Sequence, residues 1–280
     1  MPFTDSDAIA LVVYMAVVRS PRSNTKSVYF SGFRMLHLMK GSNALSLGTD
    51  IVNQMIVGVK NGNPAADVLS DRKSRQPVTI DVMLRLQQSI KSSEMTLRQK
   101  RLVWLAATSC LLGSFRVHKV LPEQRHSYDK TTTLMTEDVV KTTMSHEGVT
   151  TKTLLYHIKD PKENKSPLGI KVEIFENVGS LSWLCAVKSY EKYLAVGNGP
   201  APNQPLFTMQ DGSGYTGRMF NDDIKTLLTG KIDKSLGPLT THSFKAGMAT
   251  MMAEAGCSDD QIQLAGRWSS DAFKLYVSDG

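Results

Sequence analysis

The stretch 240–276 constrains the fold of this chain most, because its residue types predict three short helices in succession. Thr240 and Thr241 are suited to cap the first helix. The second is expected to begin at Ser258, which has capping-box spacing with Gln261. Three helices this close together can bury their apolar faces only against one another or against a neighbouring core.

The ends and faces of these helices can also be predicted. Gly256 suits the left-handed residue that ends the first helix, and the second is expected to run to Gly266. The apolar face of the first helix would consist of Phe244, Met248, Met251 and Met252. Ser269, Ser270 and Asp271 can cap a third helix that carries Tyr276. Such helices are also expected in an ordinary packed core or in a helix-turn-helix protein that binds DNA. A catalytic role can therefore be inferred only from the joint spacing of several reactive side chains.

Composition limits the class of protein. The chain has 280 residues, 41% of them hydrophobic, which suffices for one large or two medium domains. Its formal net charge of +7 favours a polyanionic partner. The apolar run at 9–18 is too short to cross a bilayer, and it follows Asp5 and Asp7, where a signal peptide would carry basic residues. The cysteines are odd in number and far apart: Cys110, Cys185 and Cys257. We expect an intracellular protein with reduced thiols and no metal site.

A charged stretch followed by a proline, DRKSRQPVT at 71–79, marks a domain boundary. Helical patterning precedes it over 5–19, 24–40, 47–60 and 64–70. We predict a helical domain over 1–72, a basic linker over 73–79 and a second domain over 80–280. The second domain should open with helices that start at Ile80 and extend to about residue 112. Two strands, 152–159 and 169–175, should then flank a polar turn, with a further helix around 181–196.

Five residues of the carboxyl-terminal stretch occur in an order that points to a function. His242 and Lys245 are one helical turn apart, Arg267 and Trp268 follow the second helix, and Tyr276 lies near the end. This order resembles the tyrosine recombinase (phage-integrase-like) family, which cuts and rejoins DNA through a phosphotyrosine link. Within that family, GRWSSDAF at 266–273 looks most like the DIRS-type and crypton-type recombinases of eukaryotic mobile elements.

The resemblance implies a fold and a partner. The fold would be mainly α with a small antiparallel β-sheet: a helical core-binding domain and an α+β catalytic domain, forming a C-shaped clamp around double-stranded DNA. The DNA-binding residues of the first domain and the linker would be Arg22, Lys26, Arg72, Lys73 and Arg75. The protein would assemble into a dimer or tetramer on DNA and act in the nucleus, or beside the nucleoid if it is not eukaryotic. No membrane, small-molecule substrate or cofactor is implied.

The resemblance also assigns catalytic roles. Tyr276 would attack the phosphorus, with His242 as its base. Arg116 and Lys245 would hold the non-bridging oxygens, and the indole N–H of Trp268 would support the phosphate, with Arg267 as the alternative. The proton for the departing 5′ oxygen would come from Lys162 in the polar turn, with Lys159 as the alternative. Because one phosphoester is exchanged for another, neither ATP nor a metal is needed.

Two positions depart from the family pattern. Lys245 stands where the family has arginine, which keeps the charge but loses the planar fork that grips phosphate. Lys119 stands where an acidic residue usually follows Arg116 by three positions. The alternatives to an active recombinase are therefore a weakened or domesticated one that serves as a DNA-binding module, and a relaxing enzyme of the type IB topoisomerase kind.

Overall fold

The computed structural model describes residues 76–146, 149–159, 169–197, 199–232, 239–240, 242–268 and 270–277. All of them belong to a compact unit that begins at Ser74. The DNA-contacting residues predicted for the first domain and the linker lie outside the described residues: Arg22, Lys26, Arg72, Lys73 and Arg75. Lys162 lies outside them as well.

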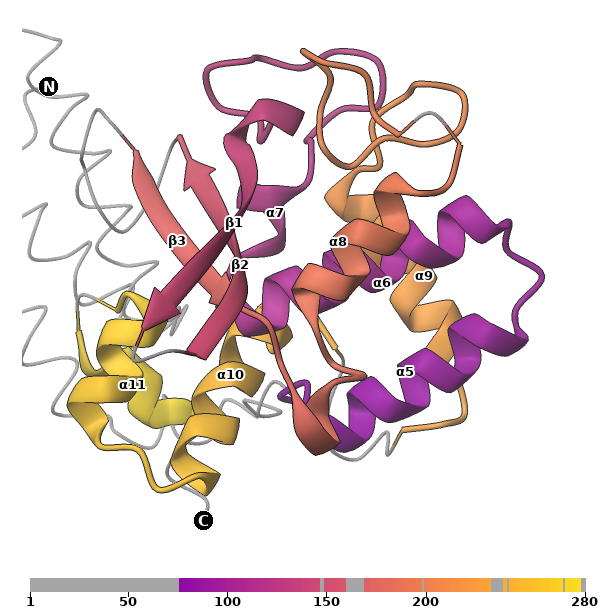
Figure 1. The fold of residues 1–280 in the computed structure, drawn as a ribbon. Coiled ribbons are helices and arrows are strands. Elements are labelled where there is room, and N and C mark those ends of the chain that lie inside the picture. Colours follow the sequence, from indigo (N-terminus) through magenta and orange to yellow (C-terminus); the bar gives the residue numbers. More distant parts are fainter. Residues whose placement is uncertain are drawn as a thin grey trace, which may run out of the picture. The chain divides into compact units, whose positions relative to one another are not determined.

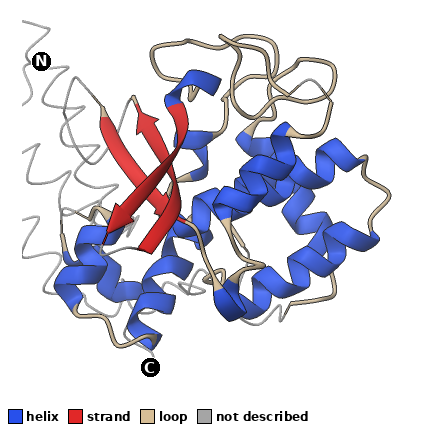
Figure 2. Ribbon diagram, viewed as in Figure 1, coloured by secondary structure: helices blue, strands red, loops and turns tan. Residues whose placement is uncertain are grey.

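The described unit is mainly helical with a small sheet, which confirms the predicted fold class (Figure 2). Its first half contains α5 (Ile80–Ser92), α6 (Leu97–Leu112), α7 (Val117–Val120), the short η2 (Thr136–Asp138), β1 (Val139–His146), β2 (Val149–Ile158) and β3 (Ile170–Phe175). Its second half contains η3 (Gly179–Leu181), α8 (Ala186–Leu194), α9 (Gly217–Leu228), α10 (Ser243–Glu254), α11 (Asp259–Gly266) and the 3-10 helix η5 (Asp271–Tyr276). In Figure 1 the sheet lies beside α6, and α11 lies on the side of α10 that faces away from α5.

The central element is α6, which contacts α5, α8, α9 and α10. A capping box between Thr96 and Gln99 starts it. Every residue from Leu102 to Leu111 is buried, so this part of the helix is covered on all sides and lacks an amphipathic pattern. Even its buried Arg98 is satisfied, since it donates to the carbonyls of Val196 and Thr208. The helix therefore provides a fixed base for the residues that follow it.

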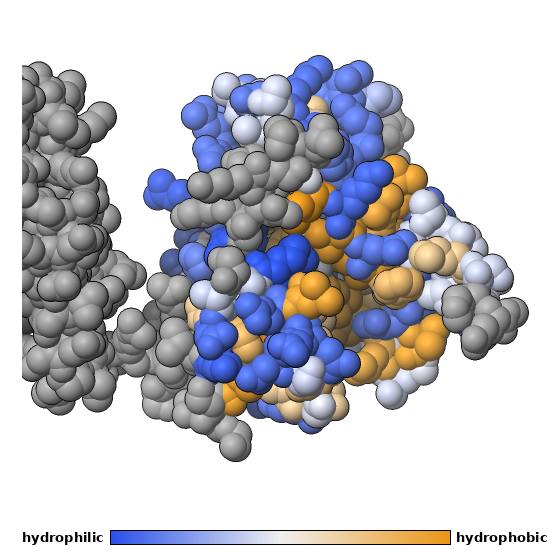
Figure 3. Space-filling model, turned by 90° about the vertical axis from the view of Figure 1, so that its left-hand side faces the viewer, coloured by the Kyte–Doolittle hydropathy of each residue, from blue (hydrophilic) through white to orange (hydrophobic). Residues whose placement is uncertain are grey.

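The sheet has the antiparallel order β1–β2–β3. Its inner face buries Leu154, Tyr156 and Ile158 of β2 against the core. Its outer face exposes Val140, Met144 and Phe175; Figure 3, which views the left-hand side of Figure 1, shows apolar surface interspersed among hydrophilic residues. Two strands were predicted, and the structure adds β1, whose residues alternate too weakly to mark it. The predicted helix at 181–196 is shorter in the structure, where α8 covers only Ala186–Leu194.

The carboxyl-terminal elements follow the prediction in part. The capping box at Ser258 and the left-handed Gly256, with φ of 78°, are confirmed. The predicted cap of the first helix is wrong. The helix begins at Ser243 with His242 as N-cap, because the Thr240 hydroxyl accepts from the His242 amide and holds a turn ahead of the helix. The third element is a 3-10 helix, η5.

A glycine allows α10 to pack closely against the core. A Cβ on Gly247 would lie 2.2 Å from the carbonyl oxygen of Val78, so only glycine permits this approach. The Val78 amide donates to the Ser243 carbonyl at 3.0 Å. The predicted apolar face is only partly correct: Phe244 is buried, whereas the three methionines are half-buried. The start of α10 is thereby fixed relative to the core.

Three further observations concern the part of the chain that the structure describes. All three cysteines are unpaired, as predicted. Of the helices described, none has the length and hydrophobicity needed to cross a bilayer. Within the described ranges, no cluster of three or more histidine, cysteine or acidic side chains is arranged to hold a metal ion.

Candidate active site

Three cationic side chains from distant parts of the chain meet at one place. Arg116 is the N-cap of α7, directly after α6; Lys245 lies in the first turn of α10; Arg267 ends α11. Burial, and then the charges of both arginines, lower the pKa of Lys245, and burial, and then the charge of Arg116, lower the pKa of Arg267. Such mutual effects require the three charges to lie close together. The fold therefore concentrates positive charge between α6, α10 and α11.

Lys245 is the most deeply buried member of this cation cluster, which we define as Arg116, Lys245 and Arg267. Only 4% of Lys245 is exposed, and its Nζ lies 4.8 Å from the centre of the Trp268 ring. Burial, and then the nearby Arg116 and Arg267, lower the pKa of Lys245 to about 7. Its place in the first turn adds the partial positive charge of the α10 amino terminus to the same field. An anion at this point would relieve the repulsion among all three side chains.

Arg267 connects the carboxyl-terminal helices to the segment that carries Arg116. It adopts a left-handed conformation with φ of 55°, which turns the chain at the end of α11. Its Nη2 donates to the carbonyls of Gly113 at 2.7 Å and Ser114 at 2.9 Å. Burial, and then Arg116, lower its pKa to about 10. Arg267 thus contributes charge and also holds the turn before Arg116 in place.

Tyr276 is within electrostatic range of Arg116. Burial lowers the pKa of Arg116, and the charge of an ionised Tyr276 opposes that shift. The half-buried tyrosine is the last residue of η5. Its carbonyl accepts a hydrogen bond of 3.0 Å from the Thr250 hydroxyl of α10. The tyrosine also packs on a small core formed by Ala249, Ile262 and Phe273.

Trp268 presents its ring to Lys245 and packs against Phe273, with ring centres 5.9 Å apart. A Cβ on Gly266 would come within 1.5 Å of the indole ring, so glycine is needed to admit it. Residue 268 was predicted to act through its N–H group, whereas its observed contact with Lys245 uses the face of the ring. Trp268 and Arg267 were the two candidates for supporting the phosphate, and of these Arg267 adds charge to the cation cluster.

His242 precedes Lys245 by three residues, and Lys119 follows Arg116 by three residues. His242 is the half-buried N-cap of α10, and its carbonyl accepts from Ala246 in the first turn of that helix. It therefore precedes Lys245 at the same helix end. Lys119 is in α7, where its amide donates to the carbonyl of Arg116 at 2.9 Å. The short helix α7 thus fixes the backbone of Arg116 from the carboxyl side.

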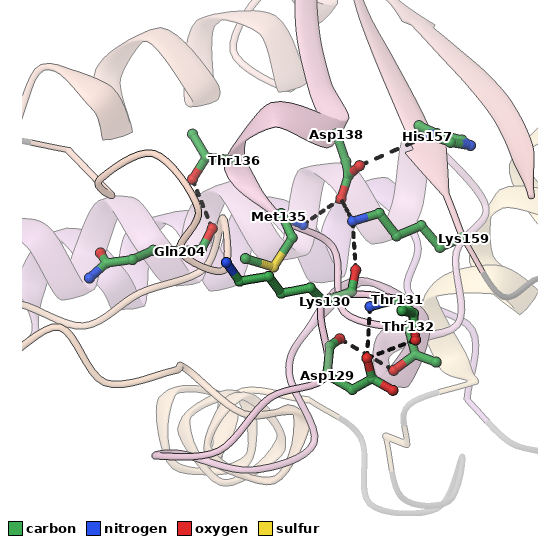
Figure 4. A network of polar contacts seen from close by, with 10 residues as sticks. All are labelled: Asp129, Lys130, Thr131, Thr132, Met135, Thr136, Asp138, His157, Lys159 and Gln204. Atoms are coloured by element: carbon green, nitrogen blue, oxygen red, sulfur yellow. Dashed lines mark hydrogen bonds and ion pairs between the residues drawn. The ribbon is translucent and has the colours of Figure 1, made fainter.

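Lys159, the alternative catalytic lysine, belongs to a separate polar network (Figure 4). Its Nζ lies 2.6 Å from a carboxylate oxygen of Asp138 and donates to the carbonyl of Lys130 at 2.8 Å. Asp138 is only 7% exposed and also accepts from the Met135 amide. His157 Nδ1 lies 4.0 Å from the other oxygen of Asp138. This network ties the end of β2 to η2 and holds the ammonium group of Lys159 there.

Comparison with known proteins gives structural likenesses only. No protein-family model and no curated protein matches the sequence. The XerH site-specific recombinase bound to its difH substrate is 15% identical with a TM-score of 0.48, over 72% of this chain and 50% of that one. The Tn1549 transposon integrase in complex with circular intermediate DNA is 14% identical with a TM-score of 0.46, over 95% and 93%. The FLP recombinase in a Holliday junction complex is 10% identical with a TM-score of 0.45, over 82% and 53%. This chain therefore spans half the length of the XerH chain, and the proposals below rest on its own residues.

Proposed function

We propose that the protein is a DNA strand transferase of the tyrosine recombinase type, which breaks and rejoins double-stranded DNA at specific sites. The observation that supports this most strongly is that Tyr276 and Trp268 pack on the same small core, while Trp268 faces Lys245 of the cation cluster. A phosphodiester carries one negative charge, and attack on phosphorus adds more charge to its equatorial oxygens. Fixed cations stabilise that charge because they are already in place before the reaction. The motif GRWSSDAF supports a place near the DIRS-type and crypton-type recombinases.

The proposed reaction exchanges one phosphoester for another. The hydroxyl oxygen of Tyr276 attacks phosphorus and passes its proton to His242. The bond from phosphorus to the 5′ oxygen breaks, and Lys162 gives that oxygen a proton. The products are a 3′-phosphotyrosyl enzyme and a free 5′-hydroxyl. Attack by another 5′-hydroxyl reverses these steps and rejoins the strand, so the total number of phosphoester bonds is conserved.

The cation cluster would bind the phosphate throughout. Arg116 and Lys245 would contact the non-bridging oxygens, and Arg267 would add charge while supporting the turn before Arg116. Trp268 would keep the Lys245 ammonium oriented by its ring. We favour Lys162 over Lys159 as the proton donor, because the Asp138 carboxylate already engages Lys159.

The rest of the chain would supply DNA affinity. We propose that residues 1–72 form a core-binding domain, with 73–79 as a basic linker to the catalytic domain over 80–280. Contacts to the DNA backbone would come from Arg22, Lys26, Arg72, Lys73 and Arg75. Dimers or tetramers would form on DNA, because exchange between two duplexes requires a cut in each strand. The protein would act in the nucleus if it is eukaryotic, and otherwise in the cytoplasm with the nucleoid.

Binding of duplex DNA should be accompanied by proton uptake at Lys245. With a pKa of about 7, this amine is mostly neutral in the free protein at pH 8. A phosphate beside it favours the ammonium form and raises the pKa, so binding takes up about one proton at pH 8 and far less at pH 6. Calorimetric titration in two buffers with different ionisation enthalpies measures this number directly.

The matched control is Lys245→Arg, because arginine stays charged throughout this pH range and should remove the uptake. Equal binding enthalpies in both buffers at pH 8 for the unmodified protein would contradict the placement of phosphate at Lys245.

Lys245→Arg also tests the chemistry. Arginine offers a planar fork to the phosphate, and this gain should appear mainly in the transition state, where oxygen charge is greatest. We expect single-turnover cleavage of a suicide duplex to be about tenfold faster, with little change in affinity. Lys245→Ala should cleave much more slowly than either form.

An unchanged or slower rate for the arginine variant would mean that the site is adapted to lysine, or that Lys245 does not touch the phosphate. Tight duplex binding without any covalent adduct in all three forms would favour the DNA-binding module. Relaxation of supercoiled plasmid without sequence preference would favour the topoisomerase alternative.

A further inference from the structure

A second basic site lies at the end of α6 remote from the cation cluster. A cavity of about 440 Å³ opens between the carboxyl end of α5, the amino-terminal half of α6 and the start of α8. Arg101 lines it, and α6 continues for eleven residues beyond Arg101 before it ends at Leu112. At 1.5 Å per residue, Arg101 is about 16 Å along the helix from Leu112, on the side away from Arg116.

The lining of this cavity carries positive charge and, among its described residues, no aspartate or glutamate. Its cations are Lys91, Lys100, Arg101, Lys188 and Lys192. Two of these cations also contact other parts of the protein. The Lys100 ammonium donates to the Lys91 carbonyl, and the Nζ of Lys188 lies 3.6 Å from a carboxylate oxygen of Glu176. The Arg101 Nε is buried without a hydrogen-bond partner within the described part of the chain. A buried donor left in this state favours an acceptor supplied by a ligand.

Two tryptophans form the wall of the same cavity. The rings of Trp104 and Trp183 are stacked with centres 6.2 Å apart and planes inclined by 25°. Trp104 is buried, whereas Trp183 is half-buried. Lys188 and Lys192 follow one turn apart on α8. An aromatic ring beside a row of cations is the arrangement by which proteins bind single strands, with a base on the ring and phosphates on the cations.

We propose that this cavity, called the groove below, binds single-stranded nucleic acid, with a base stacked on Trp183 and the adjoining phosphates held by Arg101, Lys188 and Lys192. A strand offers both features that the groove complements, a π-surface and regularly spaced negative charge. Duplex DNA hides its bases from such a ring, so the groove should prefer an unpaired strand. The inference does not depend on the strand-transfer chemistry proposed for the cation cluster.

The test is anisotropy of a labelled oligothymidine of about 20 nucleotides, titrated with the full chain and its variants. Trp183→Ala should weaken binding roughly 5- to 150-fold, and Trp183→Phe should restore most of the affinity because it retains a ring. Lys188→Gln combined with Lys192→Gln should reduce the slope of log affinity against log salt by about 1.4. The matched control is Lys225→Gln, which removes the same charge from an exposed position of α9 that does not line the groove.

Each result decides the matter. Oligothymidine affinity that is unchanged by Trp183→Ala, or that is lost in Lys245→Ala, would overturn the proposal, because the strand would then bind elsewhere. A peptide of alternating glutamate and leucine that binds in a Trp183-dependent way, when oligothymidine does not, would assign the groove to an acidic protein partner. Thymidine monophosphate that binds as tightly as the strand would reduce it to a nucleotide pocket. Covalent adduct formation on duplex DNA should be the same in Trp183→Ala and the unmodified protein, which separates this site from the cation cluster.

Discussion

Tyr276→Phe is expected to abolish the covalent protein–DNA adduct while duplex affinity stays nearly unchanged. The hydroxyl group is the proposed nucleophile, but the phosphate would be held by the cation cluster, which the substitution leaves intact. The ring would still pack on the small core of Ala249, Ile262 and Phe273. Denaturing electrophoresis of reactions with a nicked suicide duplex measures the adduct, and anisotropy measures the affinity.

The control for this substitution is Tyr128→Phe, which removes the hydroxyl of an exposed tyrosine that donates to the Asn203 carbonyl. It should form as much adduct as the unmodified protein. An adduct that persists in Tyr276→Phe would mean that another residue is the nucleophile.

The second large effect is expected for Arg267→Ala. This change removes one charge from the cation cluster and both hydrogen bonds to the turn before Arg116. Loss of one transition-state donor typically slows an enzyme about 100- to 1000-fold, so single-turnover cleavage should fall by at least that factor. Trp268→Phe should cost less than tenfold, because a phenyl ring still faces the Lys245 ammonium.

Together these two variants decide which residue supports the phosphate. If Trp268→Phe slows cleavage as much as Arg267→Ala, the indole N–H contacts the phosphate and Arg267 is structural. Arg267→Lys separates the functions of the arginine, since it keeps the charge but loses the fork that reaches two carbonyls. Thermal unfolding of each variant should be compared, so that a loss of rate is not mistaken for a loss of fold.

Much of the fold could be predicted from local chemistry. The capping box at Ser258 and the left-handed turn at Gly256 depend on residues within one helical turn, and both were correct. The strand β1 was missed, because only Val139 of its first residues is buried while Lys141 and Thr143 face solvent. The start of α10 was misplaced because the Thr240 hydroxyl, which was expected to cap the helix, accepts from the His242 amide and holds a turn ahead of it.

The candidate active site likewise combines features that local sequence predicts with features that depend on long-range packing. The spacing of His242 and Lys245 marked the first turn of α10, where the structure has them. The role of Arg267 could not be derived locally, since its partner Gly113 lies 154 residues earlier in the chain. Nor does the sequence reveal that Lys245 is buried between two arginines, which is what lowers its pKa to about 7. Both features arise only when α6, α10 and α11 pack together.

The measurement that tests the central claim most directly is identification of the residue that becomes linked to DNA. The full chain is incubated with a library of nicked duplexes of randomised sequence, and the species that survive denaturation in detergent are digested and analysed by mass spectrometry. We predict a nucleotide joined through its 3′ phosphate to the peptide that contains Tyr276, together with a free 5′-hydroxyl on the released strand. A covalent link at any other residue, or strong duplex binding with no link at all, would contradict strand transfer by Tyr276.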